Sequence, residues 1–188
     1  LRLHKLVEKH GDNVDNYEGC FAVDEIPVPK PPSGEVLVRV SHAPINPSDL
    51  STMQGTYNSA QRAELPCGLG YEASGVVVAS GGGFLANRLV GKRVACVTTG
   101  GGALYAQYAS VPAMNCIELP SDVAFADGCS CFVNPLTVIS FVEIAKATKH
   151  KAILHTAAAS SLGKMLVPYA KDNGVKVICV VRRDQQRQ

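Results

Sequence analysis

The sequence predicts a mainly β domain, built like a small barrel of short strands, followed by a partial α/β domain. In the first part, short β-rich runs are separated by glycine clusters at 81–83 and 100–102, a pattern typical of a small antiparallel barrel. From about Asp122 onward, helical periodicity alternates with short apolar strands. We therefore assign the first domain to residues 1–120 and the second to residues 121–188.

The expected elements of the first domain follow from alternation and apolar runs. Residues 1–34 end in a proline cluster, Pro27–Pro32, which predicts an extended lead-in. The β-rich runs predict strands at 35–40, 74–80, 92–97, 104–109 and 114–119.

The second domain is expected to contain one β-α-β unit. A helix is predicted over 136–148, followed by a strand over 151–155. Apolar residues at helical spacing then predict a helix that ends at Asn173-Gly174, with a kink at Pro168. The near-continuous apolar run 175–181 is typical of a strand buried in a parallel sheet.

The length of this second part limits what it can do. From Lys151 to Gln188 there are 38 residues, whereas a complete dinucleotide-binding fold needs about six strands. We therefore expect the chain to be a fragment, or to be completed by something outside it, and to be a poor enzyme by itself.

Composition excludes several classes of protein. Among the 188 residues, 46% are hydrophobic and 18% are charged, which rules out intrinsic disorder. A net charge of +2 gives no reason to expect nucleic acid as a partner, and no apolar run is long enough to cross a membrane. Seven scattered cysteines indicate free thiols in a reducing compartment. We expect a cytoplasmic location. The sequence starts with Leu1 rather than Met, so targeting to an organelle by a segment ahead of it is the alternative.

The turn between the strand at 151–155 and the next helix is a candidate phosphate-binding site. There, free backbone N–H groups and the positive end of a helix can meet a pyrophosphate. The three positions of the glycine-rich pattern are Ala158, Ser160 and Gly163, all small, but only one is glycine. A tight turn capped by Ser160 or Ser161 explains the same residues equally well.

Arg182 and Arg183 follow the last predicted strand. An acidic residue at this position binds the ribose hydroxyls of NAD, whereas an arginine accommodates the 2′-phosphate of NADP. The pair therefore favours NADPH as cofactor, with a solvated terminal pair of arginines as the alternative.

Residues 35–181 resemble the medium-chain dehydrogenase/reductase superfamily, specifically its zinc-independent quinone oxidoreductase-like branch. The order and spacing of the matching stretches carry the resemblance: Ile45–Leu50, Gln54–Tyr57, Leu69–Val76, Gly91–Val94, Tyr105–Ala109, Asn134–Thr137 and Ile153–Ala157. It implies a GroES-like domain followed by a Rossmann domain, with the active site in the cleft between them.

The resemblance also implies that no zinc is bound. Zinc-dependent relatives have ligands at the positions of Asn46, Tyr71 and, approximately, Val133. A catalytic zinc needs three N, S or O side-chain ligands, and these three residues do not supply them.

The activity implied by the resemblance is hydride transfer from NADPH to a quinone or an α,β-unsaturated carbonyl, a small-molecule partner. Asn46 and Tyr57 then line the substrate pocket, and Tyr57 is the side chain able to donate a proton. Asn134 and Thr137 correspond to residues near the nicotinamide. A partly buried barrel tyrosine is the alternative interpretation of Tyr57, and a homodimer is compatible with the sequence.

Two other functions stay open. The segment Met53–Tyr57 also resembles the tyrosine-bearing segment of the 2-enoyl thioester reductases. The glycine-poor turn instead favours a non-catalytic interaction module. Asp49 and Glu72 are expected to be structural, with Asp49 capping the turn after Pro47.

Overall fold

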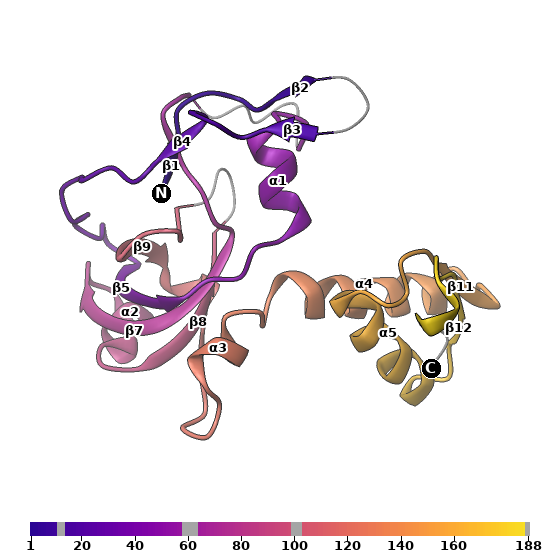
Figure 1. Cartoon of the computed structure of the whole chain (residues 1–188). Coiled ribbons are helices and arrows are strands. Elements are labelled where there is room, and N and C mark those ends of the chain that lie inside the picture. Colours follow the sequence, from indigo (N-terminus) through magenta and orange to yellow (C-terminus); the bar gives the residue numbers. More distant parts are fainter. Residues whose placement is uncertain (11–13, 58–63, 99–102, 187–188) are drawn as a thin grey trace. The chain divides into compact units, whose positions relative to one another are not determined.

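The computed structural model divides into two compact units, Leu1–Cys131 and Phe132–Gln188 (Figure 1). Each unit has its own hydrophobic core. The glycine cluster at 100–102, where the sequence predicts a break between two strands, lies outside the described residues. The residues that the structure describes are 1–10, 14–57, 64–98 and 103–186.

A five-stranded antiparallel sheet forms the framework of the first unit, with strand order β10-β8-β7-β5-β9. Alternating valines of these strands, among them Val38 and Val77 in register, point into a fully buried core. The strands are β5 (Glu35–His42), β7 (Glu72–Ser80), β8 (Arg93–Val97), β9 (Tyr108–Pro112) and β10 (Cys116–Glu118).

Short strands and helices complete this unit, and the mainly β prediction is confirmed. Strands β1 (Arg2–Leu3), β4 (Phe21–Ala22) and β6 (Cys67–Gly68) form a small sheet, and β2 (Glu8–His10) pairs with β3 (Val14–Asn16). The helical segments are α1 (Pro47–Met53), α2 (Phe84–Leu89), the 3-10 turn η1 (Ala113–Asn115) and α3 (Phe125–Gly128).

The prediction of a strand at 104–109 is wrong over its first four residues, because β9 begins at Tyr108. The backbone N–H groups of Leu104 and Tyr105 bond instead to the carbonyls of Gly70 and Leu69, at 3.2 and 2.8 Å. These long-range bonds turn the segment away from a strand ladder. The predicted strand 114–119 likewise begins late, since η1 precedes β10.

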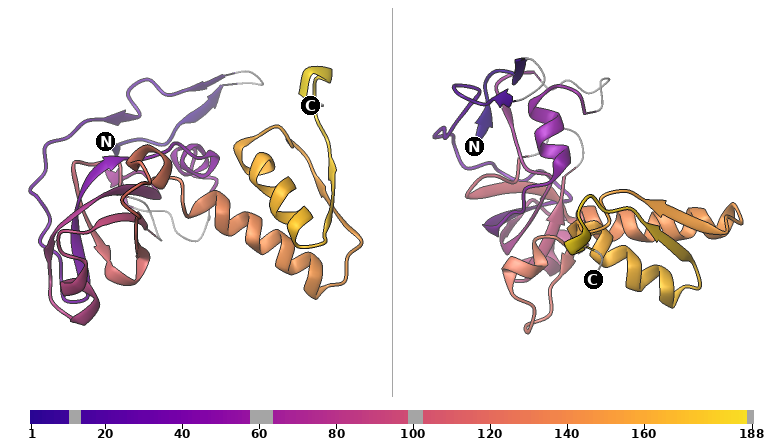
Figure 2. Two further views of the ribbon diagram at one scale, coloured as in Figure 1. Left: turned by 90° about the horizontal axis from the view of Figure 1, so that it is seen from below. Right: turned by 45° about the vertical axis from the view of Figure 1, so that its right-hand side comes forward.

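The second unit contains the predicted β-α-β unit (Figure 2). Strands β11 and β12 pair in parallel, and α5 connects them through Pro168 without a break. The core joins residues of α4 to residues of α5, including Val142 and Leu166. The elements are α4 (Val133–Ala147), β11 (Ala152–His155), α5 (Ser161–Asp172), β12 (Lys176–Cys179) and the 3-10 turn η2 (Asp184–Gln186).

Burial of the last strand differs from the prediction. Ile153 and Val177 pack against the core of the two helices, whereas Leu154 and Ile178, also in register, are 66% and 56% exposed. In a strand, neighbouring side chains point to opposite faces. One face of this two-stranded sheet is therefore open in the structure. Cys179, which lies inside the apolar run 175–181, is a free thiol and is exposed.

Candidate functional site

The candidate site of the first unit is built around α1, which begins directly after Asn46. Pro47 occupies the first turn, where the missing N–H is not needed. The Asp49 carboxylate accepts a hydrogen bond from the Asn46 backbone N–H at 2.7 Å, as in a capping box. Asp49 is completely buried, and its predicted capping role is confirmed.

The Asn46 side chain is held by Glu72. Its Nδ2 donates a hydrogen bond to Glu72 Oε1 at 2.9 Å, and the two residues are only 4% and 1% exposed. A hydrogen bond to a buried charged group is among the stronger polar contacts in proteins. The hydrogen bond from Asn46 to Glu72 fixes the orientation of the Asn46 amide, which the sequence analysis placed in the candidate site. Glu72 therefore has the structural role that we expected.

Tyr57 lies just beyond the other end of α1 and is 46% exposed. Its ring meets that of Tyr71 edge-on, with centroids 5.6 Å apart and an interplanar angle of 63°. The Tyr71 hydroxyl lies 2.7 Å from Thr52 Oγ1. Sequence reasoning missed Thr52 and considered Tyr71 only as a replaced zinc ligand, because no local pattern marks this tertiary contact.

The metal positions inferred from the resemblance can be located. Asn46 and Tyr71 flank α1 in the first unit, whereas Val133 belongs to the second unit. Among the described residues, no group of three or more His, Cys, Asp or Glu side chains is arranged to hold a metal ion.

The buried Asp49 carboxyl has an unusual electrostatic environment. Burial raises its pKa above the ordinary value of 3.8, and the charge of Glu72 acts in the same direction. The hydrogen bond from Asn46 opposes this shift. The Tyr105 hydroxyl and the Tyr71 backbone N–H oppose it too, but burial, which includes Oδ1, has the largest effect. The folded protein therefore keeps the proton on this carboxyl up to a higher pH than the unfolded chain does.

This raised pKa predicts a pH-dependent effect of Asp49→Asn on stability. An acid with a raised folded-state pKa makes folding less favourable as pH rises from the unfolded-state pKa, near 3.8, through the folded-state pKa. Asparagine keeps an acceptor for the Asn46 N–H but carries no charge. The difference in Tm, variant minus wild type, should therefore increase between pH 4 and pH 8 in thermal unfolding. The exposed Asp122→Asn is the control, and a pH-independent difference for Asp49→Asn would contradict the assignment.

The candidate phosphate turn of the second unit is tightly built. Ser160 caps α5, its Oγ accepting a hydrogen bond from the Gly163 N–H at 3.2 Å. A Cβ at Gly163 would lie 2.2 Å from the Ala158 carbonyl oxygen, so only glycine allows the turn to approach the helix this closely. The structure thus brings Ala158, Ser160 and Gly163 together at one helix start. The expected capping role of Ser160 is confirmed.

The other four predicted cofactor residues lie on neighbouring elements of this unit. Thr137 is on α4 and donates its hydroxyl hydrogen to the Val133 carbonyl at 2.7 Å, while Asn134 lies in the first turn of the same helix. Arg182 and Arg183 follow β12 with exposed side chains, and their backbone N–H groups bond to Gln186 Oε1 at 3.2 Å.

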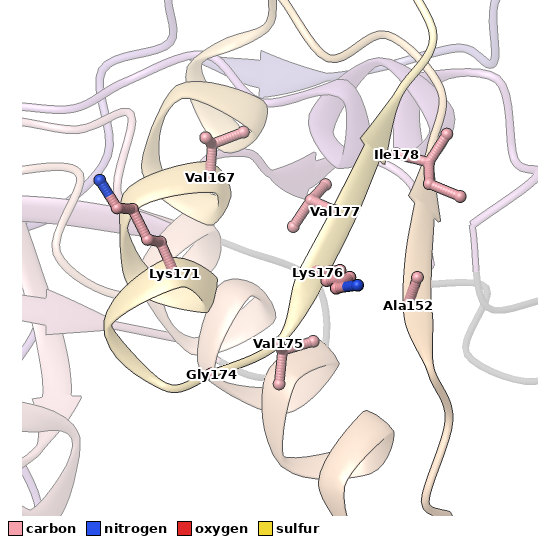
Figure 3. Close-up of a pocket in the computed structure, with 8 residues that line it drawn as sticks. All are labelled: Ala152, Val167, Lys171, Gly174, Val175, Lys176, Val177 and Ile178. Atoms are coloured by element: carbon pink, nitrogen blue, oxygen red, sulfur yellow. The ribbon is translucent and has the colours of Figure 1, made fainter.

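Figure 3 shows a groove on this unit, and none of the residues of the phosphate turn lines it. Its walls come from Val167 and Lys171 of α5, from the chain between Gly174 and Ile178, and from Ala152. Most of these residues lie around the amino-terminal ends of β11 and β12. Ligands of open parallel sheets bind at the carboxyl ends of the strands, where the turn after β11 lies. The groove is therefore not part of the predicted cofactor site.

Comparison with known proteins agrees with this architecture. Residues 32–121 match the family described as "Alcohol dehydrogenase GroES-like domain". The mitochondrial enoyl-[acyl-carrier-protein] reductase of Xenopus tropicalis is 31% identical over 178 residues, which are 94% of this chain and 49% of that protein.

Solved structures give the same result. A protein from Mesorhizobium loti, assigned as an NADPH:quinone reductase, is 41% identical with a TM-score of 0.75, over 85% of this chain and 46% of that one. The quinone oxidoreductase of Thermus thermophilus, also solved with NADPH, is 25% identical with a TM-score of 0.76, over 98% and 54%.

The chain thus carries a GroES-like domain followed by a parallel β-α-β unit, and the proteins that it matches are named as reductases and oxidoreductases. The chain belongs to the medium-chain dehydrogenase/reductase superfamily, in which it is quinone oxidoreductase-like. It spans about half the length of the curated relatives it matches. No helix among the described residues is long and apolar enough to cross a bilayer.

Proposed function

We propose that this chain supplies the substrate domain and the start of the cofactor domain of an NADPH-dependent oxidoreductase. The reaction is hydride transfer to a quinone or an α,β-unsaturated carbonyl, without zinc. The observation that carries the proposal is the arrangement around α1. A buried amide, Asn46, is anchored at one end of this helix, and a half-exposed phenol, Tyr57, lies just past the other end.

Residues of the second unit support NADPH as the proposed cofactor. The close approach at Gly163 leaves backbone N–H groups at the start of α5 for the diphosphate, beside Ala158 and Ser160. The exposed Arg182 and Arg183 supply the positive charge that a 2′-phosphate requires. Asn134 and Thr137 are the proposed neighbours of the nicotinamide. When bound, NADPH supplies the hydride.

The residues of the first unit would then act on the substrate. Negative charge develops on the oxygen of a reduced quinone or enone, and a fixed hydrogen-bond donor stabilises it. The Asn46 amide is held in place by Glu72, so it needs no reorganisation during the reaction. The Tyr57 phenol completes the reduction by donating a proton. The replacement of both candidate metal ligands in this unit, at Asn46 and Tyr71, supports a zinc-independent reaction.

A 2-enoyl thioester is the second candidate substrate. The observation that favours it is the 31% identity to an enoyl-[acyl-carrier-protein] reductase along almost the whole chain. The reaction type is the same, since hydride again reaches an activated C=C bond.

A reducing compartment, which we propose to be the cytoplasm, agrees with the free state of all seven cysteines.

A substrate panel tests the proposal. The full-length gene product is mixed with NADPH and, separately, with a simple quinone, an enone and crotonyl thioester, and NADPH oxidation is followed at 340 nm. We expect turnover with the quinone or the enone after treatment with a metal chelator. Turnover confined to the thioester would favour the second candidate. No NADPH binding would favour a non-catalytic interaction module.

The 188-residue chain by itself serves as the comparison. Its described cofactor unit supplies two sheet strands, whereas a complete dinucleotide-binding fold has about six. A poorly positioned hydride donor loses about a hundredfold in rate for a 1 Å error. We therefore expect weak NADPH binding and little turnover, and robust turnover by this chain, verified by mass, would contradict that expectation.

A further inference from the structure

The backbone of the segment Leu69–Glu72 is fixed from several sides. The carbonyl of Leu69 accepts a hydrogen bond from Tyr105 N at 2.8 Å, and that of Tyr71 accepts one from Thr98 N at 2.7 Å. Gly70 has a φ of +93°, and a Cβ there would lie 2.6 Å from the Tyr105 ring. The Tyr71 side chain therefore projects from a backbone with little freedom to move.

The hydroxyl of Tyr71 is fixed as well. Thr52 Oγ1 donates its one hydrogen to the Ser48 carbonyl at 2.8 Å. The Tyr71 hydroxyl, 2.7 Å from the same oxygen, must therefore be the donor of that second bond. Burial raises the pKa of the Tyr71 phenol, so the donor keeps its proton at neutral pH. The ring is thus attached to α1 at its tip and to the segment Leu69–Glu72 at its base.

We propose that Tyr71 is a positioning residue, whose anchored ring holds the half-exposed ring of Tyr57 by edge-to-face contact in the orientation from which Tyr57 meets the substrate. An edge-to-face pair has a preferred geometry, so it restricts the ring orientation of Tyr57. Tyr57 immediately follows the turn at the end of α1, and the same helix carries the acceptor Thr52. This proposal rests on the function proposed above, in which Tyr57 is the proton donor.

An NMR experiment on the 188-residue chain tests the contact without any reaction. Tyrosine rings are isotopically labelled, and the Tyr57 signals are identified by their loss in Tyr57→Phe. Tyr71→Leu removes the neighbouring ring and should shift the Tyr57 signals clearly. Thr52→Ala removes only the acceptor of the Tyr71 hydroxyl and should shift them less. Ser80→Ala, which removes a hydroxyl bond to Asn87 Oδ1 at the end of β7 opposite to Glu72, is the control and should not shift them.

The outcomes separate cleanly. Unmoved Tyr57 signals in a Tyr71→Leu protein whose Tyr108 and Tyr169 signals remain native would overturn the proposal. Should Tyr71→Leu fail to fold, unmoved Tyr57 signals in Thr52→Ala would overturn it equally.

Kinetics of the full-length gene product supply the second readout. Tyr71→Leu should lower kcat about tenfold, because it misorients the proton donor but leaves it in place, with the KM for NADPH unchanged. In a Tyr57→Phe background, the same substitution should change kcat less than twofold, since no phenol remains to be positioned. Full additivity of the two losses would overturn the proposal. If the wild type does not oxidise NADPH, the proposed function fails, whereas the NMR result decides the ring contact independently.

Discussion

Tyr57→Phe is expected to lower kcat of the full-length gene product by about 100-fold or more, because positioned general acids typically contribute 10²- to 10⁴-fold. Phenylalanine keeps the ring contact with Tyr71 and removes only the hydroxyl group. NADPH binding should therefore remain unchanged. The measurement is steady-state kcat with a saturating enone, together with the Kd of NADPH from fluorescence titration.

Tyr108→Phe is the matched control. Tyr108 lies on β9, an edge strand of the five-stranded sheet, and its substitution also removes one phenol hydroxyl. Its kcat should equal that of the wild type. A Tyr57→Phe enzyme that retains more than a third of the wild-type kcat would show that another group delivers the proton.

The second large effect concerns the choice between NADPH and NADH. A charge-assisted contact with the 2′-phosphate contributes about 1.5–3 kcal/mol, which corresponds to discrimination of at least tenfold. The double variant Arg182→Ala/Arg183→Ala should lose this preference in the ratio of kcat/KM for the two cofactors. The kcat/KM for NADPH should fall, whereas the kcat/KM for NADH should stay the same.

Lys176→Ala removes an exposed cation from the opposite end of β12 and should leave the ratio unchanged. A wild type that uses both cofactors equally would remove the basis of the NADP assignment. An unaltered preference in the double variant would do the same.

Local pattern was enough to predict four of the five strands of the main sheet and the β-α-β unit, because these depend on periodicity along the chain. Alternation in Glu35–His42 places its valines in the core, and small residues mark the turn before α5. The errors arose where distant contacts decide the structure. Leu104 and Tyr105 are diverted to Gly70 and Leu69, and this pairing has no local signal.

The candidate site shows the same division. Pro47 and Asp49 predicted a cap, and the cap is formed. The contacts Asn46–Glu72 and Tyr57–Tyr71 join residues far apart in the sequence, so they emerged only from the fold. The resemblance placed Tyr71 at a former metal position, but only the structure shows what the phenol contacts there instead.

Tracing the hydride tests the central claim most directly. NADPH deuterated at the transferable position of the nicotinamide is incubated with an enone and the chelator-treated full-length gene product, and the reduced ketone is analysed by mass spectrometry and NMR. The account predicts one deuterium at the β-carbon and a solvent-derived proton at the α-carbon. A product without deuterium at the β-carbon, or a reaction that begins only when zinc is added, would contradict it.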